Sequence, residues 1–248
     1  RRYARSFSRQ TRPQEMKRFY KQVAVAVAAG EGGFQILLDG RPVITPAKNR
    51  LVVPTRALAD AIAAEWAEQG DEIDPLTMPH LRLADTVIDG VAANRGDVIA
   101  AVLRFGENDA VCYRADQPPA LAQRQREAWD PVLAWAAQRH GARLATAVGL
   151  GHIEQPPEAI AALRAAVASF DSFPLAALHV AAAITGSLAL ALGLAEGVWT
   201  PAHVFRLSRL DEDYQIEKWG TDEEAERRAG ALANELGKAA EFIALARR

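Results

Sequence analysis

The pattern of hydrophobic and polar positions changes character near residue 54. Before that point the chain has short runs of apolar and β-branched residues, at positions 19–27, 34–38, 43–45 and 51–53. Runs of this length and composition are typical of β-strands. The segment Asp39-Gly40-Arg41-Pro42 between two of them is a strong turn signal. The first part of the chain is therefore predicted to form a small antiparallel sheet.

From residue 55 onward the spacing of apolar residues is that of helices. Thr55 is a favoured N-cap residue, and apolar side chains then recur every four positions at Leu58, Ile62 and Trp66. Gly70 ends this helix. We expect further helices, separated by Gly and Pro, at residues 81–93, 97–105, 120–129, 131–139, 157–170, 175–192, 201–219 and 222–246.

The two patterns together predict an α+β fold, in which a small N-terminal β-rich domain is followed by a larger all-helical domain. We divide the chain into a basic flexible arm at residues 1–17, a β-rich domain with one helix at 18–75, and a helical domain at 76–248. Half of the 248 residues are hydrophobic, which is enough for a sizeable core.

The first twelve residues contain five arginines and no acid. That composition resembles a mitochondrial targeting segment, although a disordered basic arm is the simpler interpretation. The segment lacks the apolar run of a signal peptide, so we do not expect secretion. The single cysteine, Cys112, excludes an internal disulfide, and its apolar neighbours predict a buried, inert thiol.

An uncharged run covers residues 172–195 and is long enough to cross a bilayer with a hydrocarbon core of about 30 Å. Alanine and small polar residues dominate it, and His179 interrupts it. Asp171 and Glu196 flank it in place of basic and aromatic anchors. We therefore interpret residues 175–192 as the central core helix and expect no membrane span.

Nucleotide and nucleic-acid binding find no support in the sequence. A formal net charge of −2 does not predict the broad basic surface that nucleic-acid-binding proteins have. Gly30 and Gly32 follow a strand-like run, but the third glycine of a dinucleotide fingerprint would fall on Gln35, and another strand-like run follows. We interpret this segment as a hairpin turn. Gly237-Lys238 precedes Ala239 in place of a hydroxyl residue, so it is no phosphate loop.

The candidate catalytic and metal-binding residues also lack the spacing that such sites require. Asp171, His179 and Ser187 are spaced by eight residues partly along one expected helix, which keeps them out of reach of one another. The five histidines are scattered, and none has the i, i+4 spacing of a helix-borne metal site. We therefore expect no metal and no cofactor. A pair of distant carboxylates of the glycosidase type stays open.

Acids and aromatics are concentrated near the C-terminus. Residues 211–226 contain eight acids and a single base, Lys218, and the same segment holds Tyr214, Ile216 and Trp219. It fits either a solvated helix with its aromatics turned inward or a surface that binds a basic partner. Asp222 and Glu223 follow Gly220 at an expected helix start. They serve either the helix dipole or a partner contact.

Nine short segments of the chain form a recognisable set of motifs. They are residues 18–21 (RFYK), 38–47 (LDGRPVITPA), 53–55 (VPT), 65–66 (EW), 78–79 (MP), 83–89 (LADTVID), 112–114 (CYR), 129–135 (WDPVLAW) and 208–220 (SRLDEDYQIEKWG). In their order and approximate spacing they resemble the Atp12 family of assembly chaperones for the F1 sector of ATP synthase, and the resemblance covers residues 18–242.

The resemblance implies a chaperone without enzymatic activity. Such a protein binds the unassembled F1 α subunit and prevents its aggregation until the α subunit pairs with β. We expect it to bind no nucleic acid, not to span the membrane and to be monomeric when free. The bacterial cytoplasm is the expected compartment, with the mitochondrial matrix as the alternative.

The resemblance also implies where the partner binds. The family carries functionally important acids just beyond its Trp-Gly pair, which places them on Glu223 or Asp222 here. Some relatives have a second aromatic after that acid, where this chain has Glu224. The expected partner-binding residues are therefore Glu223, Asp222, Trp219, Glu217 and Asp213.

Two functions of other classes remain as alternatives from the sequence. The first is a soluble small-molecule enzyme, with scattered acids acting in a cleft between the two domains. The second is a peripheral membrane module that binds through the basic N-terminal arm.

Overall fold

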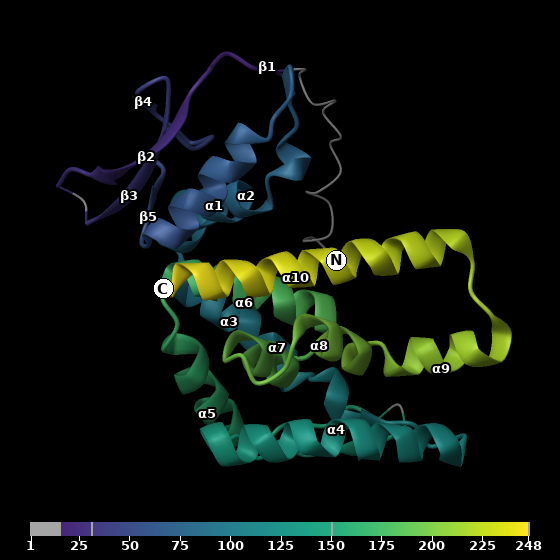
Figure 1. Cartoon of the computed structure of the whole chain (residues 1–248). Helices are drawn as coiled ribbons and strands as arrows, with labels where there is room; N and C mark the ends of the chain where they lie inside the picture. Colours follow the sequence, from purple (N-terminus) through teal and green to yellow (C-terminus); the bar gives the residue numbers. More distant parts are fainter. Residues whose placement is uncertain (1–15, 31, 150, 248) are drawn as a thin grey trace.

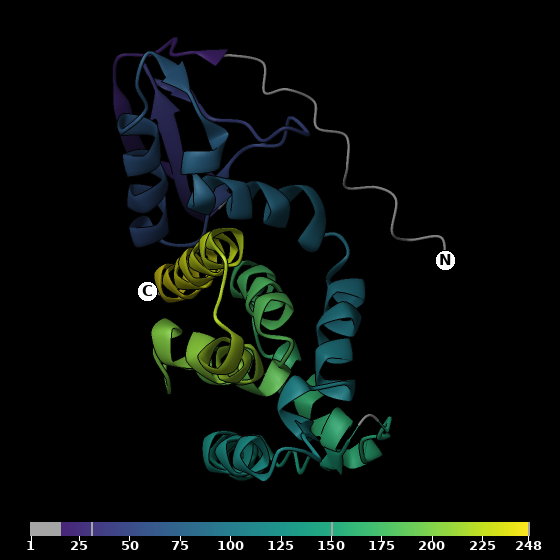
Figure 2. The ribbon, with the colours of Figure 1, turned by 90° about the vertical axis from the view of Figure 1, so that its right-hand side faces the viewer.

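A computed structural model describes residues 16–30, 32–149 and 151–247. It has a small sheet with helices α1 and α2 at one end and a larger helical body at the other (Figure 1). The last helix, α10 (Glu223–Ala246), runs between the two parts. A view from the side shows the same order of layers, with α4 farthest from the sheet (Figure 2). This arrangement confirms the predicted α+β class.

The sheet is built on the hairpin of β2 (Val23–Ala28) and β3 (Gly33–Leu38), which pair antiparallel from Val23 opposite Leu38 to Ala28 opposite Gly33. Their connection confirms the predicted hairpin turn. Asp39 and Gly40 both have positive φ values, 48° and 79°. They form the two-residue turn into β4 (Arg41–Pro42), as Asp-Gly pairs favour. β5 (Val52–Val53) pairs with β3 as well.

A separate two-stranded pairing joins β1 (Met16–Lys17) to β6 (Glu72–Ile73). Residues 16 and 17 are the last two of the expected basic arm, and residues 1–15 of that arm lie outside the described part of the chain.

Helix α1 (Arg56–Ala67) begins as the sequence predicts. The Thr55 side chain accepts a hydrogen bond from the Leu58 backbone N–H at 3.1 Å, which caps the helix. Leu58 and Ile62 are fully buried against β2 and β3, and Trp66 is 8% exposed. The Tyr20 hydroxyl donates to the Trp66 carbonyl at 2.6 Å. The apolar stripe of α1 is therefore the contact between helix and sheet.

A buried acid of α1, Glu65, connects this helix to the helices that follow it in the chain. The Glu65 carboxylate accepts hydrogen bonds from the backbone N–H groups of His80 at 2.8 Å and Leu81 at 2.9 Å. It thereby caps α2 (Pro79–Thr86), which follows the short helix η1 (Pro75–Thr77) and continues into the π-helix η2 (Val87–Val91). His80 Nδ1 lies 2.6 Å from Glu65, and His80 Nε2 lies 3.5 Å from Glu241 of α10. Glu65 and His80 thus join α1, α2 and α10.

The helical body contains the remaining elements in chain order. They are α3 (Arg95–Glu107), η3 (Ala110–Cys112), β7 (Tyr113–Arg114), α4 (Pro119–His140), β8 (Ala147–Val148), α5 (Pro157–Ala168), α6 (Ser172–Thr185), α7 (Leu188–Ala195), α8 (Pro201–Ser208), α9 (Leu210–Trp219) and α10. The body is not helical throughout, because β7 and β8 form a short parallel pair.

The predicted single helix at residues 175–192 is wrong in one respect, because the chain breaks there into α6 and α7. Gly186 has a φ of 64°, and the Ser187 hydroxyl caps α7 by accepting from the Leu190 N–H at 3.1 Å. The buried Asp109 carboxylate accepts from the Ala189 N–H at 3.0 Å. Both helices nevertheless form the centre of the core, as predicted. Among the described residues, no helix combines the length and hydropathy that a membrane span requires.

Two other helix boundaries also differ from the sequence prediction. The helix expected at 201–219 is divided at Arg209 into α8 and α9. The two helices expected at 120–129 and 131–139 are a single helix, α4, with Pro131 inside it. Proline removes the hydrogen bond to the carbonyl of the residue four positions earlier, Glu127. Pro131 and Glu127 are both exposed, so water can satisfy that carbonyl.

Candidate functional site

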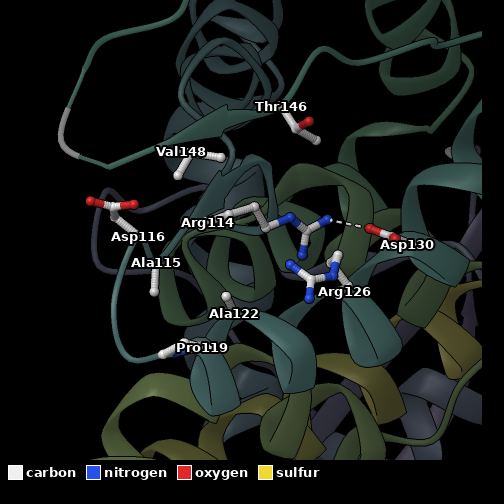
Figure 3. Close-up of a pocket in the computed structure, with 9 residues that line it drawn as sticks. All are labelled: Arg114, Ala115, Asp116, Pro119, Ala122, Arg126, Asp130, Thr146 and Val148. Atoms are coloured by element: carbon white, nitrogen blue, oxygen red, sulfur yellow. Dashed lines mark hydrogen bonds and ion pairs between the residues drawn. The ribbon is translucent and has the colours of Figure 1, made fainter.

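A cavity of about 410 Å³ lies where α4 meets β7 and β8, and Figure 3 shows its lining residues. Arg114 lines this cavity, but its guanidinium already forms hydrogen bonds within the chain. Its guanidinium donates to the Gln125 carbonyl and to Asp130 Oδ1, both at 2.8 Å, and it lies 5.1 Å from the ring centre of Trp129. These contacts attach β7 to α4. Arg114 therefore has a structural role, and the described lining of this cavity contains no Ser, Cys or His side chain.

Cys112 offers no reactive thiol either. It is fully buried, and burial raises its pKa to about 12, so the thiolate is not formed at neutral pH. The burial of Cys112 is as predicted. Within residues 16–30, 32–149 and 151–247, no group of three or more His, Cys, Asp or Glu side chains is arranged to hold a metal ion.

The acidic segment forms α9, a short turn and the start of α10. One side of α9 packs on α4. Tyr214 is buried there, and Gln125 Nε2 donates to Asp211 Oδ1 at 2.7 Å. Arg124 forms an ion pair with Glu217 at 2.7 Å, with its guanidinium 5.1 Å from the Tyr214 ring centre. Glu217, one of the expected partner-binding residues, is therefore engaged within the chain.

A groove of about 760 Å³ opens between α9 and α10, and we call it the α9–α10 groove. In Figure 1 the two helices extend from the body and are joined by the turn at residues 220–222. Its apolar lining comes from both helices and includes Ile216, Trp219, Ala225, Ala229 and Leu232. Trp219 is 78% exposed, more than any other large hydrophobic side chain in the described part of the chain.

The two acids after Trp219 have different roles. Asp222 Oδ1 accepts a hydrogen bond from the Ala225 N–H at 2.8 Å, so Asp222 is the N-cap of α10 and also lines the α9–α10 groove. Glu223 is the first residue of α10, and its side chain is 94% exposed and 3.7 Å from Arg227. Of the two, Asp222 has the clear local role and Glu223 is the more available for a partner.

The charge around this groove is more balanced than the acidic count from the sequence indicates. Glu224 pairs with Arg228 at 3.0 Å, and Asp213 lies 3.7 Å from Arg209. Arg209 and Arg228 both line the groove, and both fall just outside the segment in which the acids were counted. The groove therefore presents an indole and aliphatic side chains bordered by ion pairs.

The structure thus places Trp219 and Asp222 in the groove and Glu223 next to it in the chain. Asp213 pairs with Arg209 at the border of the groove, and Glu217 pairs with Arg124 of α4. The contribution of α10 to this groove was not predicted, because Leu232 is thirteen positions away from Trp219 in the sequence. The signal that could have found it is the apolar stripe on α10, which continues toward the exposed end of the helix.

Comparisons with known proteins show the family of this chain. The model of the family described as ATP12 chaperone protein matches residues 17–137. The crystal structure of Atp12 from Paracoccus denitrificans is 41% identical, with a TM-score of 0.90, covering 94% of this chain and 99% of that one. An aspartate-to-lysine mutant of Atp12p from the same organism is 40% identical, also with a TM-score of 0.90, covering 94% and 98% of the two chains.

A more distant relative is the mitochondrial protein atp12 of Schizosaccharomyces pombe. It is 24% identical over 221 residues, which cover 84% of this chain and 75% of that protein. The family is described as a chaperone and not as an enzyme, in agreement with the prediction of a protein without enzymatic activity. The order of motifs, the fold and these similarities agree, and the chain belongs to the Atp12 family of chaperone proteins.

Proposed function

We propose that this protein is an assembly chaperone of ATP synthase that binds the unassembled F1 α subunit and prevents its aggregation until the α subunit pairs with β. The observation that carries the proposal is the 78% exposed Trp219 at the open α9–α10 groove. The α subunit as client rests on the resemblance of the sequence to the Atp12 family, and membership of a chaperone family supports it.

An unpaired α subunit exposes the apolar surface that its contact with β covers in the assembled enzyme. A protein that binds this surface reversibly lowers the concentration of aggregation-prone chains by mass action. Tryptophan is a frequent anchor of such contacts, because a large apolar ring is buried at a small cost in side-chain entropy. Trp219 and the apolar wall of the α9–α10 groove have these properties.

The acids beside Trp219 supply the polar part of the proposed contact. Glu223 accepts hydrogen bonds from a lysine or arginine of the client, and Asp222 contributes its charge while it caps α10. Glu217 and Asp213 lie at the edge of the contact, where their ion pairs with Arg124 and Arg209 compete with the client. Charged groups at an edge mainly set the rate of encounter and the selectivity.

The test is light scattering from freshly diluted F1 α subunit in the presence of the chaperone. Trp219→Ala is expected to lose most of the protection, and its melting temperature is expected to stay within one or two degrees of wild type, because the side chain is exposed. Val148→Ala is the matched control, since Val148 is 67% exposed on β8. Full protection by Trp219→Ala would show that the α9–α10 groove is not the client site.

We propose the bacterial cytoplasm as the compartment, with the mitochondrial matrix as the alternative. The relatives that are about 40% identical come from a bacterium, and the 24% identical relative is a mitochondrial protein. We further propose that the free protein is monomeric. Size-exclusion chromatography with light scattering checks this, since a monomer has a mass of 26.8 kDa.

A further inference from the structure

A larger cavity, of about 880 Å³, lies between α2, α6 and α10, and we call it the α2–α6–α10 groove. Apolar side chains dominate its wall, and they include Leu76, Leu83, Val91, Val98, Ala176 and Val180. Leu76 is 70% exposed, so the apolar surface continues to the solvent. The volume falls within the range of roughly 300–1,000 Å³ that is usual for ligand pockets.

One acid in this wall, Asp85, lacks a partner in the described part of the chain. Asp85 is half-buried, and its Oδ1 is buried without a hydrogen-bond partner among the described residues. Within the described residues, no basic side chain forms an ion pair with it. Arg82 lies one turn earlier on α2 and is exposed, and Lys238 of α10 is paired with Glu241 at 2.9 Å. A buried carboxylate in this state is costly to the fold.

The surroundings of Asp85 oppose its ionisation. Burial, with a smaller contribution from the nearby charge of Asp89, raises the pKa of Asp85 to about 7. Asp89 itself stays ionised, because Thr45, Asn49 and the Ala47 N–H donate to it and lower its pKa. The other charged or titratable groups that line the groove are Arg82, His179, Glu235 and Lys238.

We propose that the α2–α6–α10 groove binds an apolar segment of a client polypeptide that carries one basic side chain, and that this side chain pairs with Asp85. The apolar wall accommodates the aliphatic stem of a lysine or arginine while the charged end reaches the carboxylate. An occupant of this kind supplies the cation that the described chain does not. The inference rests on the proposed chaperone function and adds a second contact, whose groove shares no lining residue with the α9–α10 groove.

The test uses two fluorescein-labelled, capped peptides of leucine and alanine with a central lysine or a central acetyl-lysine, which keeps the stem and removes the charge. Fluorescence anisotropy is expected to show at least tenfold tighter binding of the lysine peptide to wild type. Asp85→Asn is expected to abolish this preference and to stay folded. Arg82→Gln, which removes the neighbouring cation of the groove, is expected to retain it.

Calorimetry at pH 7 in two buffers of different ionisation enthalpy adds an independent measurement. A bound ammonium lowers the pKa of Asp85, so wild type is expected to release a fraction of a proton on binding the lysine peptide. Asp85→Asn is expected to release none. Equal proton release by the two proteins would assign it to another group and would overturn the pairing with Asp85.

Three further results would overturn the proposal. The first is a lysine preference that persists in Asp85→Asn. The second is the absence of binding of the lysine peptide at concentrations up to about 1 mM, the range of weak contacts. The third is binding that arises only after removal of residues 1–15. The last result would assign the groove to the basic arm of this chain. Because no α subunit is used, failure here is distinguishable from failure of the proposed function, for which Trp219→Ala is the test.

Discussion

The two ends of α10 differ in the way their side chains are held. Toward the C-terminus Leu236 and Phe242 are fully buried, and the Thr55 hydroxyl donates to the Leu245 carbonyl at 2.6 Å. At the other end Glu223 and Glu224 are exposed and pair with arginines one turn later on the same helix. Substitutions at the buried end therefore test the fold, while substitutions at the exposed end test binding.

The largest effect is expected at the buried end of α10. Phe242 stacks on His80 and Phe173, with ring centres 6.3 Å and 6.2 Å apart. Phe242→Ala is expected to lower the free energy of unfolding by about 3–5 kcal/mol, because it leaves a cavity where three helices meet. Urea unfolding followed by circular dichroism measures the loss. A loss below about 1 kcal/mol would mean that this end of α10 is not anchored.

The next largest effect is expected at Glu65. Glu65→Ala removes the acceptor of two backbone N–H groups and leaves His80 without its closest partner. We expect a loss of about 3 kcal/mol in the free energy of unfolding, since buried donors are left unsatisfied. Glu68→Ala is the matched control, because Glu68 is an exposed acid at the C-terminal cap of the same helix. Similar losses in both variants would contradict the capping role of Glu65.

Replacement of Asp85 is expected to raise the free energy of unfolding, whereas the two substitutions above lower it. Its pKa is raised to about 7 in the folded protein from an ordinary value near 3.8, so the folded state holds this proton more tightly than the unfolded state. The resulting destabilisation is absent below pH 4, grows as the pH rises and is complete above pH 7. Asp85→Asn removes it, and we expect a gain of about 2 kcal/mol at pH 8 after halving for partial exposure.

Thermal melts of wild type and Asp85→Asn at pH 4 and pH 8 check this prediction. The two proteins are expected to melt together at pH 4, and the variant is expected to melt several degrees higher at pH 8. Glu235→Gln, an exposed acid that lines the same groove, is expected to show no such pH dependence. An equal gain in melting temperature at both pH values would show that the titration of Asp85 does not cause it.

The smallest effect on stability is expected at the exposed end of α10. Asp222→Asn keeps the N-cap, because asparagine caps as well as aspartate, and Glu223→Lys loses only a favourable charge at a helix start. Each is expected to change the free energy of unfolding by less than about 1 kcal/mol. Protection of the α subunit is nevertheless expected to fall strongly with Glu223→Lys, because a lysine would face the basic group of the client.

Light scattering and thermal melts of the same samples separate the two effects. Glu158→Lys is the matched control, since Glu158 is an exposed acid in the first turn of α5, a helix that packs on α3 and α4. It is expected to protect as well as wild type. If Glu223→Lys also protects fully, Glu223 serves only the helix dipole and the client contact lies elsewhere.

The sequence predicted those parts of the fold that local signals determine. Asp39-Gly40 specifies its turn by itself, and Thr55 with Leu58 and Ile62 specifies the start and the buried face of α1. The break between α6 and α7 was missed, because the surrounding run is uniformly apolar. Asp109, which caps α7 with Ser187, is about eighty positions away in the sequence.

The candidate site was predictable only in part, for the same reason. Tyr214 and Trp219 belong to one short segment and have similar character, yet Tyr214 is buried against α4 and Trp219 is exposed. Which aromatic turns inward depends on the position of α4, which the sequence pattern does not give. The groove lined by Asp85 needs three helices that are distant in the sequence, so no local motif indicates it.

The hydrogen bond from Thr55 to Leu245 has a consequence for folding during synthesis. It joins residues that are 190 positions apart in a chain of 248, and the contact of Glu241 with His80 spans 161 positions. The sheet with α1 and α2 cannot gain these contacts until α10 has been made. Contacts between such distant residues slow folding, because a long loop must close before they form. The newly made chain therefore completes its own fold only after α10 has been synthesised, and until then it exposes the apolar surface that α10 later covers.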